Sequence, residues 1–131
     1  MPVKKTNKIS LNLEINIGNV NLETKALFAK HLAIMQKSGM TLIESLEIII
    51  DSSAGKFKKI LNGVLKSVES GNTLSSSFAR YPKVFNSVFV SSVYAGESSG
   101  TLDQSLENLS VQLEKESDLY LKIKGLPFYK Q

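Results

Sequence analysis

The chain has 131 residues, a length that suits one domain with short tails. It contains no cysteine, which excludes disulfides, thiolate metal ligands and a cysteine nucleophile. Its one histidine, His31, makes a zinc-hydrolase site or a Ser-His-Asp triad improbable, because these sites depend on histidine. The net charge of +4 favours an acidic partner surface, but it is not concentrated in the basic stripe typical of nucleic-acid binders. No apolar run approaches the ~20 residues needed to cross a bilayer, so we expect a soluble chain.

Residues 1–21 differ from the rest of the chain. Between Ile9 and Ile17 an apolar residue occupies every second position, which is the pattern of a half-buried strand. No second strand follows, and a lone strand is unstable in water. Three arrangements remain open: the segment pairs with a copy of itself, lies along the helices, or is disordered. We therefore assign residues 1–21 to an N-terminal tail or linker.

Apolar residues at helical spacing predict six helices between residues 22 and 125. Their approximate ranges are 23–37, 42–53, 57–70, 74–80, 86–98 and 102–124. The last is the longest, and its apolar residues follow the steps of four and three typical of a bundle helix: Leu102, Leu106, Leu109, Leu113 and Tyr120. Gly125 and Pro127 end it, which leaves residues 126–131 as a C-terminal stub.

One short sequence motif occurs three times, at residues 38–42, 70–74 and 99–102. Each copy contains Ser-Gly followed by threonine and leucine. Glycine adopts the left-handed conformation that ends a helix, and the threonine that follows can cap the next helix. Thr41 has Glu44 three residues later and Thr101 has Gln104, so these two turns also predict capping boxes. The fold class is therefore an all-α, antiparallel six-helix bundle with short Gly/Thr turns.

No catalytic constellation emerges from the sequence. Glu44 and Glu47 lie one turn apart, but a capping box explains Glu44 better. We interpret His31 as an ordinary, partly buried histidine. Four acids of the last helix are expected on its solvated face, although a pair of them could bind a cation at a subunit contact: Glu107, Glu114, Glu116 and Asp118. We expect no cofactor and no resident metal.

Four lysines of the third helix lie on or beside the side opposite its apolar residues: Lys56, Lys58, Lys59 and Lys66. They form either a solubilising surface or a docking face for an acidic partner. In the fifth helix, Gly96 costs about 1 kcal/mol in helix propensity, which indicates a neighbour that needs the space. Glu97 lies in the last turn, where the helix dipole disfavours an anion. Unless Glu97 is simply exposed, it has a specific partner: a backbone N–H, a lysine or another subunit.

The sequence from Ala95 to Leu102 resembles the signature of the F-domain of inner-membrane platform proteins from type II secretion and type IV pilus systems. Further matches follow in order at residues 28–33, 38–42, 68–78, 81–85 and 122–124. The residues that carry this family motif are Ala95, Gly96, Glu97, Ser99, Gly100 and Leu102.

The resemblance implies an all-helical, non-enzymatic domain on the cytoplasmic face of the inner membrane, with a tendency to dimerise. The platform protein would link an assembly ATPase and its adaptors to a growing pilus or pseudopilus. Such proteins usually carry two F-domains separated by membrane-spanning helices. We therefore expect residues 22–125 to be the first domain and residues 126–131 to precede a membrane segment.

A small helical DNA-binding regulator is the alternative, since the basic pI and the short turns allow it. The single arginine, Arg80, and the lack of a helix rich in Arg, Asn and Gln argue against it. We expect no nucleic-acid partner.

Overall fold

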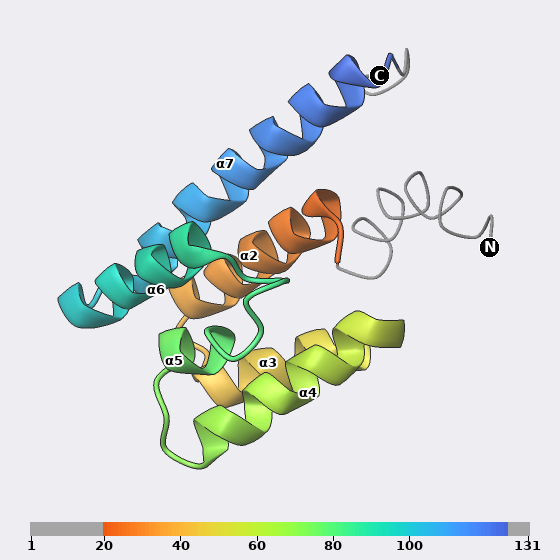
Figure 1. Ribbon diagram of the computed structural model, residues 1–131. Helices are drawn as coiled ribbons and strands as arrows, with labels where there is room; N and C mark the ends of the chain where they lie inside the picture. Colours follow the sequence, from red (N-terminus) through yellow and green to blue (C-terminus); the bar gives the residue numbers. More distant parts are fainter. Residues whose placement is uncertain (1–19, 126–131) are drawn as a thin grey trace.

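The computed structural model describes residues 20–125, and within that range it contains six α-helices and no strand (Figure 1). The helices are α2 (Leu22–Lys37), α3 (Leu42–Asp51), α4 (Gly55–Glu69), α5 (Leu74–Phe78), α6 (Ser87–Ser99) and α7 (Leu102–Ile123). The expected all-α bundle is confirmed, and each helix begins and ends within two residues of its expected bounds. The strand-like pattern of residues 9–17 and the stub 126–131 lie outside the described residues.

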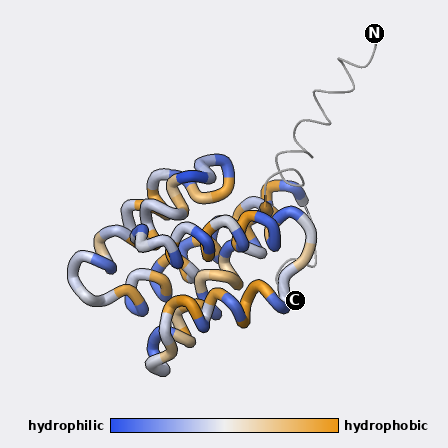
Figure 2. Tube along the Cα trace, turned by 90° about the horizontal axis from the view of Figure 1, so that it is seen from below, coloured by the Kyte–Doolittle hydropathy of each residue, from blue (hydrophilic) through white to orange (hydrophobic). Residues whose placement is uncertain are grey.

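The helices form a closed ring in which each packs against two others. α2 lies against α7, α7 against α6, α6 against α5, α5 against α4, α4 against α3, and α3 returns to α2. Figure 1 shows α2 running alongside α7, with α3 and α4 as a second pair and α5 between the two layers. Along the tube in Figure 2, hydrophobic and hydrophilic residues alternate within the helices, as amphipathic packing requires.

Small residues line the contact between α2 and α7. The buried positions of α2 include Ala26, Ala29 and Ala33, while α7 contributes Ser110 and Ser117. Side chains of this size let the two helix backbones approach closely. This seam joins the first and last described helices, which run antiparallel.

Two sequence-based expectations about these helices are wrong. His31 is exposed, because α2 buries its alanine-rich side and turns His31 away from the core. Tyr120 was expected on the apolar stripe of α7, yet it is 37% exposed. The reason is that α2 begins at Leu22, level with this part of α7, so no further turn of α2 covers Tyr120.

Five phenylalanines fill the centre of the ring: Phe28, Phe57, Phe78, Phe85 and Phe89. The rings of Phe78 and Phe85 are 4.4 Å apart between centroids, and those of Phe28 and Phe57 meet edge to face at 5.4 Å. Because they come from α2, α4, α5, α6 and the loop before α6, these rings connect both layers. Aromatic pairs of this geometry contribute about 0.5–1.5 kcal/mol beyond their buried area.

The helix caps follow the sequence at one predicted box and depart from it at the other. The Thr41 hydroxyl accepts the Glu44 N–H at 3.1 Å, and the Glu44 carboxylate accepts the Thr41 N–H at 3.3 Å, so this capping box is confirmed. The predicted box at Thr101 is wrong. Thr101 has ψ of 43° instead of the 157° at Thr41, and its hydroxyl lies 2.7 Å from Ser99 Oγ.

One lysine is drawn into the protein. Lys25 Nζ, from α2, donates a hydrogen bond of 2.9 Å to the carbonyl oxygen of Val84 in the loop before α6. Burial lowers the pKa of Lys25, and the negative charge of Glu116 opposes this shift in part. The bond ties the proline-containing loop to α2, next to the aromatic core.

Candidate functional site

The family motif forms the junction between α6 and α7. Gly100 ends α6 with φ of 76°, and the Thr101 N–H donates to the Gly96 carbonyl oxygen at 2.9 Å. Gly96 is buried at the crossing of the two helices. A Cβ atom there would lie 2.5 Å from Ser105 Oγ and 3.0 Å from Leu102 Cα. The expectation that Gly96 makes room for a neighbour is therefore confirmed.

Glu97 has the most specific contacts of the motif. Its carboxylate accepts three hydrogen bonds from the start of α5: Leu74 N–H at 2.6 Å, Ser75 N–H at 3.2 Å and the Ser75 hydroxyl at 2.6 Å. Of the partners that the sequence left open, the structure shows backbone N–H groups. The carboxylate lies at the end of its own helix but at the beginning of α5, where a negative charge is favourable.

This contact joins the second and third copies of the Ser-Gly turn, which are far apart in the sequence. Thr73 caps α5 as well, because its hydroxyl accepts the Ser76 N–H at 3.1 Å. Glu97 and Thr73 together satisfy three amides of a helix of five residues. Sequence reasoning placed Glu97 in the motif but missed Ser75. The residue type could have indicated the role of Ser75, because serine side chains often form hydrogen bonds at the start of a helix.

The other motif residues lie around this contact. Ala95 and Ser99 are exposed, and the Ser99 hydroxyl donates to the Ala95 carbonyl oxygen at 2.9 Å. Leu102 is half-buried against the core. The six motif residues therefore form a connection between α5, α6 and α7.

The four lysines of α4, which we call the lysine face, surround the outer side of that helix. Lys56, Lys59 and Lys66 are exposed, whereas Lys58 is half-buried. Among the described residues, none of the four forms an ion pair. The opposite side of α4 is held in the core by its apolar residues: Phe57, Ile60, Leu61 and Val64. The lysine face is thus an open basic surface on a rigid helix.

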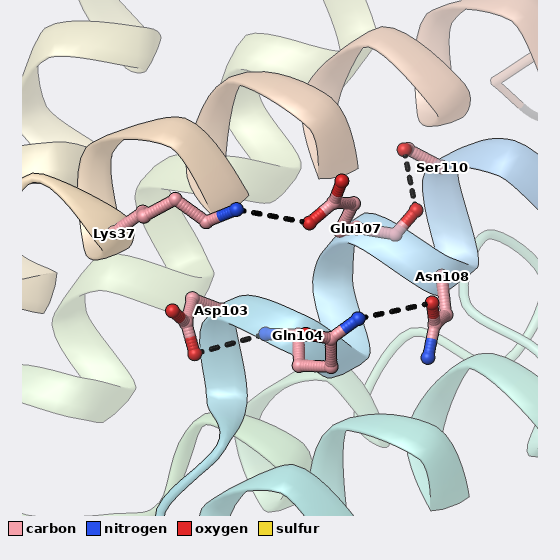
Figure 3. A network of polar contacts seen from close by, with 6 residues as sticks. All are labelled: Lys37, Asp103, Gln104, Glu107, Asn108 and Ser110. Carbon is pink, nitrogen blue, oxygen red and sulfur yellow. Dashed lines mark hydrogen bonds and ion pairs between the residues drawn. The ribbon is translucent and has the colours of Figure 1, made fainter.

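A second charged surface runs along the contact of α2 with α7, where Lys37 Nζ lies 3.1 Å from Glu107 Oε1 (Figure 3). Both side chains are at least half exposed, so this pair contributes about 0–1 kcal/mol. A shallow cleft of about 320 Å³, the α2–α7 cleft, lies beside the pair. Its lining comprises Lys30, Ala33, Ile34, Lys37, Glu107, Ser110, Val111 and Glu114.

Three of the four acids of α7 are exposed as the sequence predicts, and the fourth, Asp118, is not. Glu107, Glu114 and Glu116 are exposed, and Asp118 is half-buried. Within residues 20–125, no three His, Asp or Glu side chains are grouped so as to hold a metal ion. No helix in that part of the chain combines the length and the apolar character that a membrane crossing requires.

Comparison with known proteins gives a consistent result. Residues 28–126 match the family described as type II secretion system (T2SS), protein F. The type IV pilus assembly protein PilC of Myxococcus xanthus is 33% identical over 132 residues, covering 98% of this chain and 32% of the relative. PilC of Thermus thermophilus is 38% identical over 109 residues, covering 82% of this chain and 27% of the relative.

A secretion protein is similar to the same degree. The type II secretion system protein F of Vibrio cholerae is 37% identical over 105 residues, covering 79% of this chain and 26% of the relative. The chain thus spans about a quarter to a third of the length of these relatives. The matched range contains the aromatic core, the lysine face and the Glu97 junction, and the chain belongs to the type II secretion system protein F family.

Proposed function

We propose that this chain is a non-catalytic cytoplasmic domain of an inner-membrane platform protein, and that it couples an assembly ATPase to the assembly of a pilus or pseudopilus. The relatives are named for pilus assembly and for secretion, which supports a place in such a machine. The observation that carries the coupling role is the lysine face. Three of its lysines are exposed, none of the four forms an ion pair within residues 20–125, and the other side of the helix is anchored in the core.

The chemistry of the lysine face determines the partner. Clustered ammonium groups attract a surface rich in Asp and Glu, and such complementarity speeds association and selects the partner. Lys59 and Lys66 lie seven residues apart, which places them on the same side of α4, away from the buried apolar residues. They are the pair best placed to touch an acidic patch on the ATPase or one of its adaptors.

A binding experiment tests this proposal. The chain, immobilised at its C-terminus, is titrated with the assembly ATPase and with each adaptor from the same genome. The variant Lys59→Glu/Lys66→Glu should weaken binding about tenfold or more. The matched control, Lys115→Glu/Lys122→Glu, changes the net charge equally and has the same spacing on α7. Absence of binding, or equal weakening by both variants, would contradict the proposed role.

We also propose the domain arrangement that accompanies this function. Residues 22–125 are the first F-domain, residues 1–21 are its tail, and residues 126–131 precede a membrane-spanning segment in the complete protein. The coverage of the relatives supports this, since the chain accounts for only about a quarter to a third of their length. The reading frame tests it: an apolar segment of ~20 residues should follow residue 131.

A homodimer fits the α2–α7 cleft. Ile34 and Val111 are 55% and 47% exposed there, with lysines on the α2 side and glutamates on the α7 side. A two-fold axis through this surface would place each row of charges opposite its complement. Sedimentation equilibrium of the chain should detect a dimer that Val111→Lys weakens, whereas the same substitution at Val88, exposed on α6, should not. A dimer unaffected by Val111→Lys places the interface elsewhere.

The DNA-binding alternative finds less support than the platform role. The family relationship favours a machine component, and the exposed lysines of α4 are not accompanied by an arginine on that helix. A mobility-shift experiment with duplex DNA at about 150 mM salt should show no complex.

A further inference from the structure

A groove separate from the lysine pair and from the α2–α7 cleft crosses the start of α2, the end of α3 and the start of α4. Its volume is about 570 Å³, within the range of ligand-binding clefts. Its apolar lining residues are Val20, Leu27, Phe28, Ile49, Ala54 and Phe57, of which Phe28, Ile49 and Phe57 are buried. Leu27 is 48% exposed and supplies the largest exposed apolar side chain of the lining. We call this site the α2–α4 groove.

Lys56 carries the one formal charge among the residues that line the α2–α4 groove. Lys56 and His31 are the titratable side chains in its lining, and no Asp or Glu is among the lining residues. The groove also reaches Ala54, which caps α4 without a side-chain hydrogen bond, and the first turn of α4 contains no acid. The apolar floor therefore ends in a positively charged rim at the beginning of α4.

These two features define the occupant. An amphipathic helix inserts apolar side chains at positions i, i+4 and i+7 into such a groove, and acidic residues beside them complement a basic rim. A basic helix would bring its charges against Lys56. A wholly polar segment would leave the half-exposed Leu27 uncovered. The charge complementarity and the apolar floor together select an acidic amphipathic helix.

We propose that the α2–α4 groove binds an acidic amphipathic helix of a partner protein, with a leucine-like side chain against the exposed Leu27 and a carboxylate beside Lys56. The inference goes beyond the proposed coupling to the ATPase, because it assigns a groove that shares only Lys56 with the lysine face, together with the chemistry of its ligand. Lys59 and Lys66 lie outside the lining of the groove. Failure of one proposal is thus separable from failure of the other.

The probe is a fluorescein-labelled helical peptide of about 16 residues, with leucines at i, i+4 and i+7 and glutamates elsewhere. Fluorescence anisotropy with the full chain should show saturable binding that weakens at high salt. A peptide with lysines in place of the glutamates should bind at least about tenfold more weakly. In NMR spectra of the chain, shift changes should concentrate at Leu27, Ile49 and Phe57.

Matched variants locate the binding. Lys56→Glu should weaken the acidic peptide about five- to tenfold, whereas Lys66→Glu, on the same helix but outside the groove, should change affinity less than about twofold. Leu27→Gln should also weaken binding, and Ile34→Gln, which replaces an exposed residue of α2 outside the groove, should not. Circular dichroism of every variant distinguishes lost binding from lost folding.

Four outcomes would overturn the proposal. The first is absence of binding at millimolar peptide, and the second is equal binding of the acidic and basic peptides. The third is that Leu27→Gln abolishes binding of the chain to phosphatidylglycerol vesicles but leaves its binding to the peptide unchanged. That result would assign the groove to a membrane surface. The fourth is a large gain in peptide affinity when Leu11 and Leu13 are both replaced by Asp, which would identify the chain's own N-terminal tail as the occupant.

Discussion

Replacing Glu97 tests the junction between α5 and α6 most directly. Its carboxylate accepts three hydrogen bonds, of which two are 2.6 Å long and all come from residues that are buried in the fold. Hydrogen bonds to a charged group contribute about 1.5–3 kcal/mol each, and a buried donor left without a partner adds its desolvation cost. Because Glu97 itself is half-buried, water can replace part of this loss.

We therefore expect Glu97→Ala to lower the free energy of unfolding by about 3 kcal/mol. Glu97→Gln retains one acceptor oxygen and should cost about half as much. For a domain of this size the alanine variant should melt about 12–20 °C below the parent chain. Urea and thermal unfolding, followed by circular dichroism at a fixed pH, measure both quantities.

The control is Glu114→Ala, an exposed glutamate of α7, which should change stability by less than about 0.5 kcal/mol. Hydrogen exchange adds a local test, since the Leu74 and Ser75 amides should lose protection in Glu97→Ala. A loss below about 1 kcal/mol, or one equal to that of the control, would refute the reasoning. Unchanged exchange at these two amides would do the same.

Three further predictions concern other contacts. A Cβ added at Gly63 would overlap the Tyr81 hydroxyl oxygen, so Gly63→Ala should lower the free energy of unfolding by about 1–2 kcal/mol. The loss should be smaller in the Tyr81→Phe background; additive losses from the two substitutions in a double-mutant cycle would contradict this. Thr41→Ala should cost about 1 kcal/mol and Thr101→Ala less than half of that, as measured by urea unfolding; equal losses would contradict the assigned caps. Because the pKa of Lys25 is lowered in the folded state, the unfolded chain binds its proton more tightly, and the parent chain should gain stability relative to Lys25→Met as pH rises towards 10.5; a difference independent of pH would exclude this linkage.

The sequence predicted the local structure well because its signals are local. Gly39 and Thr41 determine a helix end and a helix start within three residues, and the capping box follows from residue types alone. The Thr101 box failed because a cap needs extended backbone, and the tight turn at Gly100 places Thr101 outside that region. Residue types report the potential for a cap, whereas backbone angles decide whether it forms.

The candidate sites were less predictable because they depend on which side of a helix is covered. The sequence predicted a partly buried His31, because His31 is spaced with the apolar residues of α2 at the helical period. The structure instead buries Ala26, Ala29 and Ala33, and this orientation of α2 leaves Leu27 and His31 exposed in the α2–α4 groove. The partner of Glu97 was beyond local reasoning as well, because α5 begins 23 residues earlier in the chain.

The seam between α2 and α7 has a mechanical consequence. Asn21 and Leu121 line one small cleft, so the chain enters and leaves the described bundle at the same edge. Force that pulls these two ends apart acts across the axes of the antiparallel helices, so it loads the contacts nearest this edge first and Lys37 with Glu107 at the far end last. The bundle can therefore be inserted into a longer protein through two adjacent connections, and tension between these connections would open the seam progressively from that edge instead of shearing it along its whole length.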